Sequence, residues 1–152
     1  MTTPSNGARS MLVRHVTVDR TRTPEEMINA TGRKEYASRE ALATMPGKGE
    51  VTEEAVDLYL FTLGRYLTND EQERELEAHG LVPDPYAQIQ VNIDDPHFAD
   101  DHPNGAQWRD NEGRACYIVF YRASDYQRNV YVNCGAYGWH GYWWCGGRRS
   151  AK

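Results

Sequence analysis

The sequence predicts a single α+β domain, because signals for helices and signals for strands occupy different parts of the chain. Most helix-start signals fall before residue 100, whereas the residues from 115 onward alternate as strand residues do. A length of 152 residues suits one domain with its own core. Residues 1–10 are polar and are expected to be disordered, which leaves residues 11–152 as the domain.

Two capping boxes predict the first helices. Thr23 is followed by a proline and by Glu26, a pattern in which the Thr and Glu side chains bond reciprocally to orphan backbone N–H groups. Thr68 and Glu71 repeat this spacing and open a highly charged helix over residues 70–79. Because that helix has little apolar content, it is expected to lie on the surface.

Two Asp-Pro pairs predict further helix starts. Asp84 is expected to cap a helix over residues 85–93, and Asp95 is expected to cap a short turn over residues 96–101. Residues 102–105 and 110–113 are rich in Gly, Asn, Asp and Pro, so both are predicted as turns.

Strand signals are short segments rich in branched and aromatic residues. Such segments are favoured in sheets because these side chains pack well on a pleated surface. The predicted strands are residues 11–18, 56–63, 115–121, 129–133 and 142–145.

Residues 129–147 differ from the rest of the chain, since they contain no charged residue although charged residues make up 26% of the sequence. They are rich in Tyr, Trp, Gly and Asn, a composition typical of binding surfaces. Trp139, Trp143 and Trp144 are expected in the core, because consecutive strand residues point to opposite faces and at least one must be buried. The residues interleaved with glycine, Tyr131, Tyr137, His140 and Tyr142, are expected to be exposed.

The charge and hydropathy of the chain exclude several classes of partner. A net charge of -5 disfavours nucleic acid, whose binding depends on basic surfaces. The N-terminus lacks the apolar core of a signal peptide, and no apolar run is long enough to cross a bilayer. The sequence therefore predicts a soluble protein, cytoplasmic or virion-associated, with neither nucleic acid nor membrane insertion among its interactions.

The cysteines leave several alternatives open. Cys116, Cys134 and Cys145 could be three thiols, or Cys134 and Cys145 could form a bridge. Cys134, His140 and Cys145 lack the paired spacing of structural zinc sites, and no Cys and His pair comes with an orienting group for catalysis. We therefore predict no catalytic residue, no metal and no cofactor.

A calcium site is the weaker interpretation of the acidic residues near position 100. Calcium prefers several carboxylate oxygens, but no EF-hand loop is present and a solvated helix face explains these residues equally well. The residues concerned are Asp94, Asp95, Asp100 and Asp101.

The C-terminal third resembles the variable proteins of diversity-generating retroelements, which have a C-type lectin fold. The resemblance rests on residues 116–120 (CYIVF), 128–133 (RNVYVN), the three tryptophans and the closing residues 146–149 (GGRR). Upstream, residues 18–21 (VDRT), 30–34 (ATGRK), 63–66 (LGRY) and 102–105 (HPNG) are also similar to the constant part of such proteins.

This resemblance implies a C-type-lectin-like domain, a fold shared with the formylglycine-generating enzyme, with a variable segment over about residues 121–145. In that family, miscopied template adenines turn Asn codons into codons for many residues but not Trp, and between residues 129 and 142 only Trp139 lies outside the accessible set. The implied variable face consists of Asn129, Tyr131, Asn133, Cys134, Gly135, Ala136, Tyr137, Gly138, His140, Gly141 and Tyr142.

The function that follows is non-enzymatic binding of an unknown, macromolecular ligand, a protein or cell-surface molecule, by a hypervariable surface on a fixed scaffold. Two alternatives remain: an enzyme of the formylglycine-generating type, which uses cysteines, and a glycan-binding lectin module that stacks sugars on Trp and Tyr. The residues that would bind calcium and sugar in true C-type lectins are not evident in the sequence.

Overall fold

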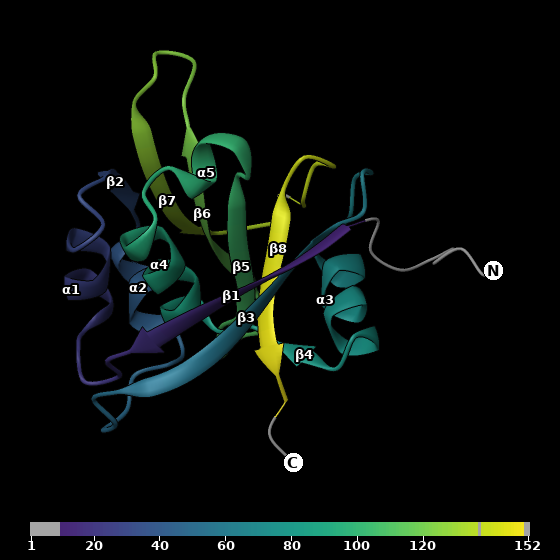
Figure 1. Ribbon diagram of the computed structural model, residues 1–152. Helices are drawn as coiled ribbons and strands as arrows, with labels where there is room; N and C mark the ends of the chain where they lie inside the picture. Colours follow the sequence, from purple (N-terminus) through teal and green to yellow (C-terminus); the bar gives the residue numbers. More distant parts are fainter. Residues whose placement is uncertain (1–9, 137, 151–152) are drawn as a thin grey trace.

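The computed structural model describes residues 10–136 and 138–150, which fold around one mixed sheet of eight strands (Figure 1). Seven strands follow the order β1-β3-β8-β5-β6-β7-β2, and β4 pairs with β8 beside this path. The β5–β8 and β2–β7 pairs are parallel and the other pairs are antiparallel. The strands are β1 (Ser10–Val18), β2 (Lys34–Ala37), β3 (Glu54–Thr62), β4 (Leu81–Val82), β5 (Asn104–Arg109), β6 (Ala115–Arg122), β7 (Arg128–Cys134) and β8 (Trp144–Arg149).

Within the described residues, five helices complete this α+β domain. They are α1 (Pro24–Asn29), α2 (Arg39–Thr44), α3 (Asn69–Ala78), α4 (Pro85–Asp94) and α5 (Phe98–Asp101). Three of them, α1, α3 and α4, start at the predicted caps. Both capping boxes are confirmed: the Glu26 amide donates to the Thr23 hydroxyl at 3.1 Å, and the Glu71 amide donates to the Thr68 hydroxyl at 3.1 Å. Asp84 caps α4 by accepting from the Ala87 amide at 3.2 Å.

The predicted short turn over residues 96–101 is present and contains α5, but the prediction that Asp95 caps it is wrong. Asp95 is the C-cap residue of α4, and α5 follows His97, which makes no side-chain cap. One Asp95 oxygen accepts from Arg14 of β1 at 2.8 Å, and the other accepts from the His97 amide at 3.3 Å. The Asp95 carboxylate thus pairs with Arg14, which is distant in the sequence, instead of capping a helix as the local Asp-Pro pattern predicted.

The predicted turn over residues 102–105 is also wrong in its second half, because Asn104 and Gly105 begin β5. Asn104 is fully buried, and its side-chain oxygen accepts from Gln88 at 2.7 Å and from Asn92 at 2.9 Å. Partners on α4 therefore satisfy an Asn that would otherwise favour a turn.

Other boundaries differ by a few residues. The prediction of disorder over residues 1–10 falls outside the described residues except at Ser10, which belongs to β1. The last strand begins at Trp144 rather than at residue 142 and continues to Arg149. The short elements β2, α2 and β4 were not predicted, since none has a strong periodic pattern.

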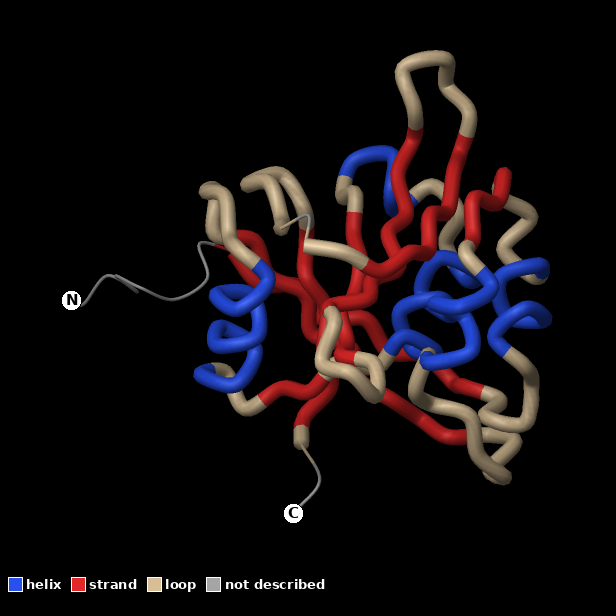
Figure 2. Tube along the Cα trace, turned by 180° about the vertical axis from the view of Figure 1, so that it is seen from behind, coloured by secondary structure: helices blue, strands red, loops and turns tan. Residues whose placement is uncertain are grey.

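The two faces of the sheet are covered differently. Helices α1, α2 and α4 lie together on one side, and α3 lies on the other side beside β4 and β8 (Figures 1 and 2). We call the first side the covered face. We call the opposite side, which carries Tyr59, Tyr117, Tyr121, Tyr131 and Trp143 around a smaller apolar cluster, the aromatic face.

The tryptophans divide between the faces as the strand pattern predicted. Trp144 packs against the core of the covered face, whereas Trp143 packs against the aromatic face. Trp139 is buried, with 3% of its surface exposed. Trp139 therefore lies in the core as predicted, whereas Trp143 and Trp144 are only half-buried.

A buried ion cluster joins α4 to the sheet. Arg20 follows β1, and its guanidinium donates to both Asp84 oxygens at 2.8 and 2.7 Å and to Glu54 at 2.7 Å. Bidentate bonding to Asp84 is the main factor that raises the pKa of Arg20, and the Arg20 bond lowers the pKa of Glu54. Asp84 thus both caps α4 and neutralises a buried cation.

Among residues 10–136 and 138–150, no helix has the length and apolar character needed to cross a membrane.

Candidate functional site

An open hollow of about 700 Å³ lies on the aromatic face over β6 and β7. Its strand residues are Tyr117, Val119 and Tyr121 at alternate positions of β6, Arg122 at the end of β6, and Tyr131 of β7. Val119 and Tyr131 are paired across the two strands, so their side chains share one face of the sheet. The β6–β7 hairpin extends beyond the neighbouring strands at the top of Figure 1.

Tyr131 is supported from the edge of the sheet. Its ring stacks on Tyr36 of β2 with 5.8 Å between the ring centroids. The parallel β2–β7 register sets Tyr36 directly beside Tyr131. Tyr131 therefore lines one wall of the hollow, and the stacked Tyr36 ring, which is 42% exposed, supports it from outside the lining.

The opposite wall is the loop between β7 and β8, which Trp139 anchors. The Trp139 indole donates to the Gln107 side chain at 2.8 Å, and its backbone exchanges two hydrogen bonds with Leu67 at 2.7 and 2.8 Å. Asn69 also donates to the Gln107 oxygen, at 2.7 Å. These bonds fix the loop to β5 and to the start of α3.

An aromatic series runs along this loop to the floor of the hollow. His140 stacks on Tyr142 at 5.8 Å between centroids, Tyr142 contacts Trp143 at 5.3 Å, and Trp143 meets Tyr121 edge-on at 6.1 Å. Tyr142 is 61% exposed. The hollow thus offers several ring surfaces to a ligand without requiring its own core to open.

Charged residues close one end of the hollow. Asp100 of α5 accepts two hydrogen bonds from Arg128 at 3.0 and 2.7 Å and has a longer contact with Arg122, at 3.5 Å. Bonding to Arg128 is the main factor that lowers the pKa of Asp100. Arg33 lies buried nearby and donates to the carbonyls of Pro96 and Asn129.

The structure brings four of the predicted site residues together at this hollow. Tyr131, Gly138, His140 and Tyr142 all line it. Gly135 and Ala136 line a second, smaller hollow instead, beside Arg109.

The other predicted residues have different surroundings. Asn129 is buried, with 6% of its surface exposed, and therefore does not belong to an accessible face. Asn133 is half-buried, and its side-chain oxygen accepts from the Cys134 amide. The Gly141 carbonyl accepts from Thr62 at 2.8 Å. Tyr137 lies outside the described residues.

Two of the loop glycines have backbone reasons to be glycine. Gly138 has φ 74°, and a Cβ there would clash with the Tyr66 ring and lie 2.9 Å from the Leu67 carbonyl. A Cβ on Gly141 would lie 2.7 Å from backbone atoms of residues 64 and 65. Side chains cannot replace either glycine unless the loop shifts.

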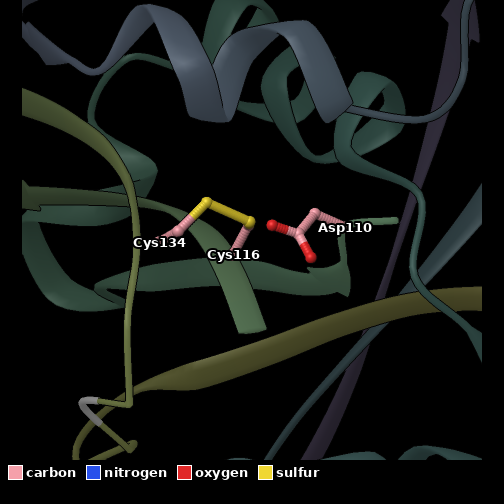
Figure 3. Close-up of side chains that lie close together, drawn as sticks. All are labelled: Asp110, Cys116 and Cys134. Carbon is pink, nitrogen blue, oxygen red and sulfur yellow. A yellow bond between two sulfur atoms is a disulfide. The ribbon is translucent and has the colours of Figure 1, made fainter. Parts of the chain in front are cut away.

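The cysteine chemistry differs from the alternatives that the sequence left open. Cys116 and Cys134 face each other on β6 and β7 and form a disulfide, so Cys134 is not bridged to Cys145 (Figure 3). Cys145 is a free buried thiol, and burial raises its pKa to about 12. Cys145 is therefore protonated at neutral pH and is a poor nucleophile.

No metal centre follows from these groups. Within the described part of the chain, one set of three potential ligands lies together, Asp110 with Cys116 and Cys134 (Figure 3). Both sulfurs are in the disulfide, so they are not thiolates. Near position 100, Asp94 accepts from Gln90, Asp95 pairs with Arg14 and Asp100 pairs with Arg128, which leaves these carboxylates engaged.

Sequence reasoning missed most of the hollow, since only four of its 16 described lining residues were predicted as site residues. Tyr117, Tyr121 and Arg122 belong to β6, and Asp100 belongs to α5. The alternation in β6 carried a usable signal, since it sets Tyr117, Val119 and Tyr121 on one face. No local signal relates Asp100 to a strand 28 residues later.

Comparisons with protein-family models, with curated proteins and with solved structures found no match to this chain.

Proposed function

We propose that this protein is a non-enzymatic ligand-binding protein and that the aromatic hollow is its recognition surface. One observation carries the proposal: ring surfaces from β6, β7 and the β7–β8 loop converge on an open space of about 700 Å³. Tyr and Trp bury large areas at small entropic cost, and a rigid scaffold holds them ready for a ligand. The anchored Trp139 supplies that rigidity.

The cysteines support binding over catalysis of the formylglycine-generating type. Two of the three are consumed by the disulfide, and the third is a buried thiol whose raised pKa keeps it protonated. A Cu(I) titration followed by thiol labelling tests this alternative, and metal binding by Cys145 would favour the enzyme.

We propose further that the domain is C-type-lectin-like and is a variable protein of a diversity-generating retroelement. Side-chain exposure and backbone geometry reduce the number of positions in the implied variable face at which other side chains can be accommodated. Tyr131, Asn133, Ala136, His140 and Tyr142 can accept other side chains on this backbone. The buried Asn129 and the two crowded loop glycines suit the scaffold instead.

Gene context tests the retroelement proposal. A neighbouring reverse transcriptase gene is expected, with an imperfect repeat of codons 129–142 that differs only at template adenines. Changes confined to the narrowed positions would support the structural argument, whereas a locus with neither feature would contradict the retroelement origin and leave the binding proposal intact.

A displayed library of random peptides tests the binding proposal directly. Peptides selected on the wild-type protein should lose at least about tenfold in affinity for the Tyr131→Ala/Tyr142→Ala double variant, because each ring offers a binding hot spot. Tyr59→Ala is the matched control, since Tyr59 lies on the same face outside the hollow. Selected peptides that bind the folded double variant as well as the wild type would overturn the proposal.

A further inference from the structure

At the charged end of the hollow, three arginines gather around one carboxylate, Asp100. Arg122 and Arg128 share Asp100, and Arg33 has no carboxylate within salt-bridge distance among the described residues. Arg33 is held by backbone carbonyls, which do not neutralise its charge. Burial, and next the charge of Arg128, lowers the pKa of Arg33 to about 10, so it remains a cation at neutral pH.

Arg122 is the cation best placed to meet a ligand. Arg128 already holds both Asp100 oxygens, whereas Arg122 makes one contact to Asp100 at 3.5 Å. The Arg122 side chain is 39% exposed and lines the hollow, and its guanidinium lies 4.7 Å from the Tyr126 ring centroid. A planar guanidinium with donors still available is suited to a carboxylate.

Two other polar side chains of the lining are already engaged. The Asn69 amide is bonded to Gln107, and the Asp100 oxygens are bonded to Arg128. A sugar needs several free donors and acceptors to read its hydroxyl groups, whereas an aromatic side chain needs ring surfaces, which this hollow supplies. The ring surfaces and the exposed Arg122 guanidinium together suit a peptide that carries both an aromatic ring and an anion.

We propose that the hollow binds an acidic protein segment in which an aromatic side chain enters between the Tyr131 and Trp143 walls and a neighbouring carboxylate pairs with Arg122. This inference rests on the proposed function and specifies its ligand class. Because the whole chain carries a net charge of -5, the attraction is local to this end of the hollow and does not extend to polyanions.

Two capped tetrapeptides test the inference, acetyl-Gly-Trp-Asp-Gly-amide and its Asn counterpart, titrated into the full chain and followed by NMR. The Asp peptide should bind about fivefold more tightly at low salt, because it adds one partly exposed ion pair. Arg122→Gln should remove this difference and leave the affinity for the Asn peptide unchanged. Arg39→Gln is the matched control, since Arg39 is exposed on α2 at the covered face.

The outcomes separate the two proposals. Equal affinity for both peptides, or a difference that survives Arg122→Gln, overturns the acidic-ligand inference while the binding function stands. Binding of N-acetylglucosamine at Trp143 with no binding of either peptide also overturns it, in favour of a glycan. Failure of both peptides together with failure of the random-peptide library overturns the binding function itself.

Discussion

The two faces of the sheet differ in how completely helices cover them. On the covered face, helices α1, α2 and α4 bury a continuous apolar core, and the buried Arg20 beside it is neutralised by Asp84 and Glu54. On the aromatic face, α3 covers only the part near β4 and β8, and large rings remain accessible over β6 and β7. From this contrast we propose that stability is concentrated on one face and recognition on the other.

The largest expected effect on stability comes from removing the Arg20–Asp84 ion pair of the covered face. Asp84→Ala should lower the free energy of unfolding by about 3–5 kcal/mol, because it leaves the buried Arg20 with less compensation and removes the α4 cap. Urea denaturation followed by circular dichroism measures the loss.

Asp100→Ala is the matched control for that experiment. Arg128 and Arg122 are 34% and 39% exposed and can be solvated when Asp100 is lost, so the expected cost is about 1 kcal/mol or less. Equal destabilisation by the two substitutions would show that Asp84 and Asp100 contribute equally to the free energy of unfolding. Stability would then not be concentrated on the covered face.

A smaller effect is expected from the loop that forms the wall of the hollow. Gly138→Ala should cost about 1–3 kcal/mol and weaken peptide binding, because the new Cβ meets both an unfavourable φ of 74° and the Tyr66 ring. Gly113→Ala measures the cost of the unfavourable φ alone, since Gly113 has φ 83° and no atom lies within 4 Å of an added Cβ.

The comparison of these two glycine variants gives the cost of the clash at the hollow. Gly138→Ala should lower the free energy of unfolding more than Gly113→Ala does, and only Gly138→Ala should alter the tryptophan fluorescence of the folded protein. If the two variants lose equal stability and both retain binding, the loop accepts side chains and Gly138 returns to the set of changeable positions.

Local chemistry explains which parts of the fold the sequence could predict. The capping boxes at Thr23 and Thr68 and the alternation of β6 depend on residues close together in the chain, and all three are confirmed. Asp95 and Asn104 were misassigned because their decisive partners lie on elements distant in the chain or folded against them, Arg14 on β1 and Gln88 on α4. The local preference of a residue for a cap or a turn is overridden where its side chain forms such tertiary bonds.

The candidate site was predictable to a similar degree. The composition of residues 129–147 indicated the loop wall, including His140 and Tyr142, but it could not indicate that Asn129 is buried or that Cys134 bonds to Cys116. Both facts depend on the β6–β7 register, and register follows from the packing of whole strands.

The smallest expected effect concerns the tip of the β6–β7 hairpin, where Tyr126 is 75% exposed with φ 69°. A bulky residue in this region costs about 1–2 kcal/mol relative to an ordinary conformation, and Asn tolerates it better. Tyr126→Asn loses the ring beneath the Arg122 guanidinium, worth about 0.5 kcal/mol at an exposed site. The net expectation is a gain in stability of about 0.5 kcal/mol.

Tyr126→Phe is the control, since it keeps both the ring and the strained backbone and should leave stability unchanged. If Tyr126→Asn is more stable and binds the acidic tetrapeptide more weakly, the Tyr126 ring at the hairpin tip holds Arg122 in place for a ligand at a cost in stability. A loss of stability in Tyr126→Asn would instead make Tyr126 part of the scaffold and remove the hairpin tip from the recognition surface.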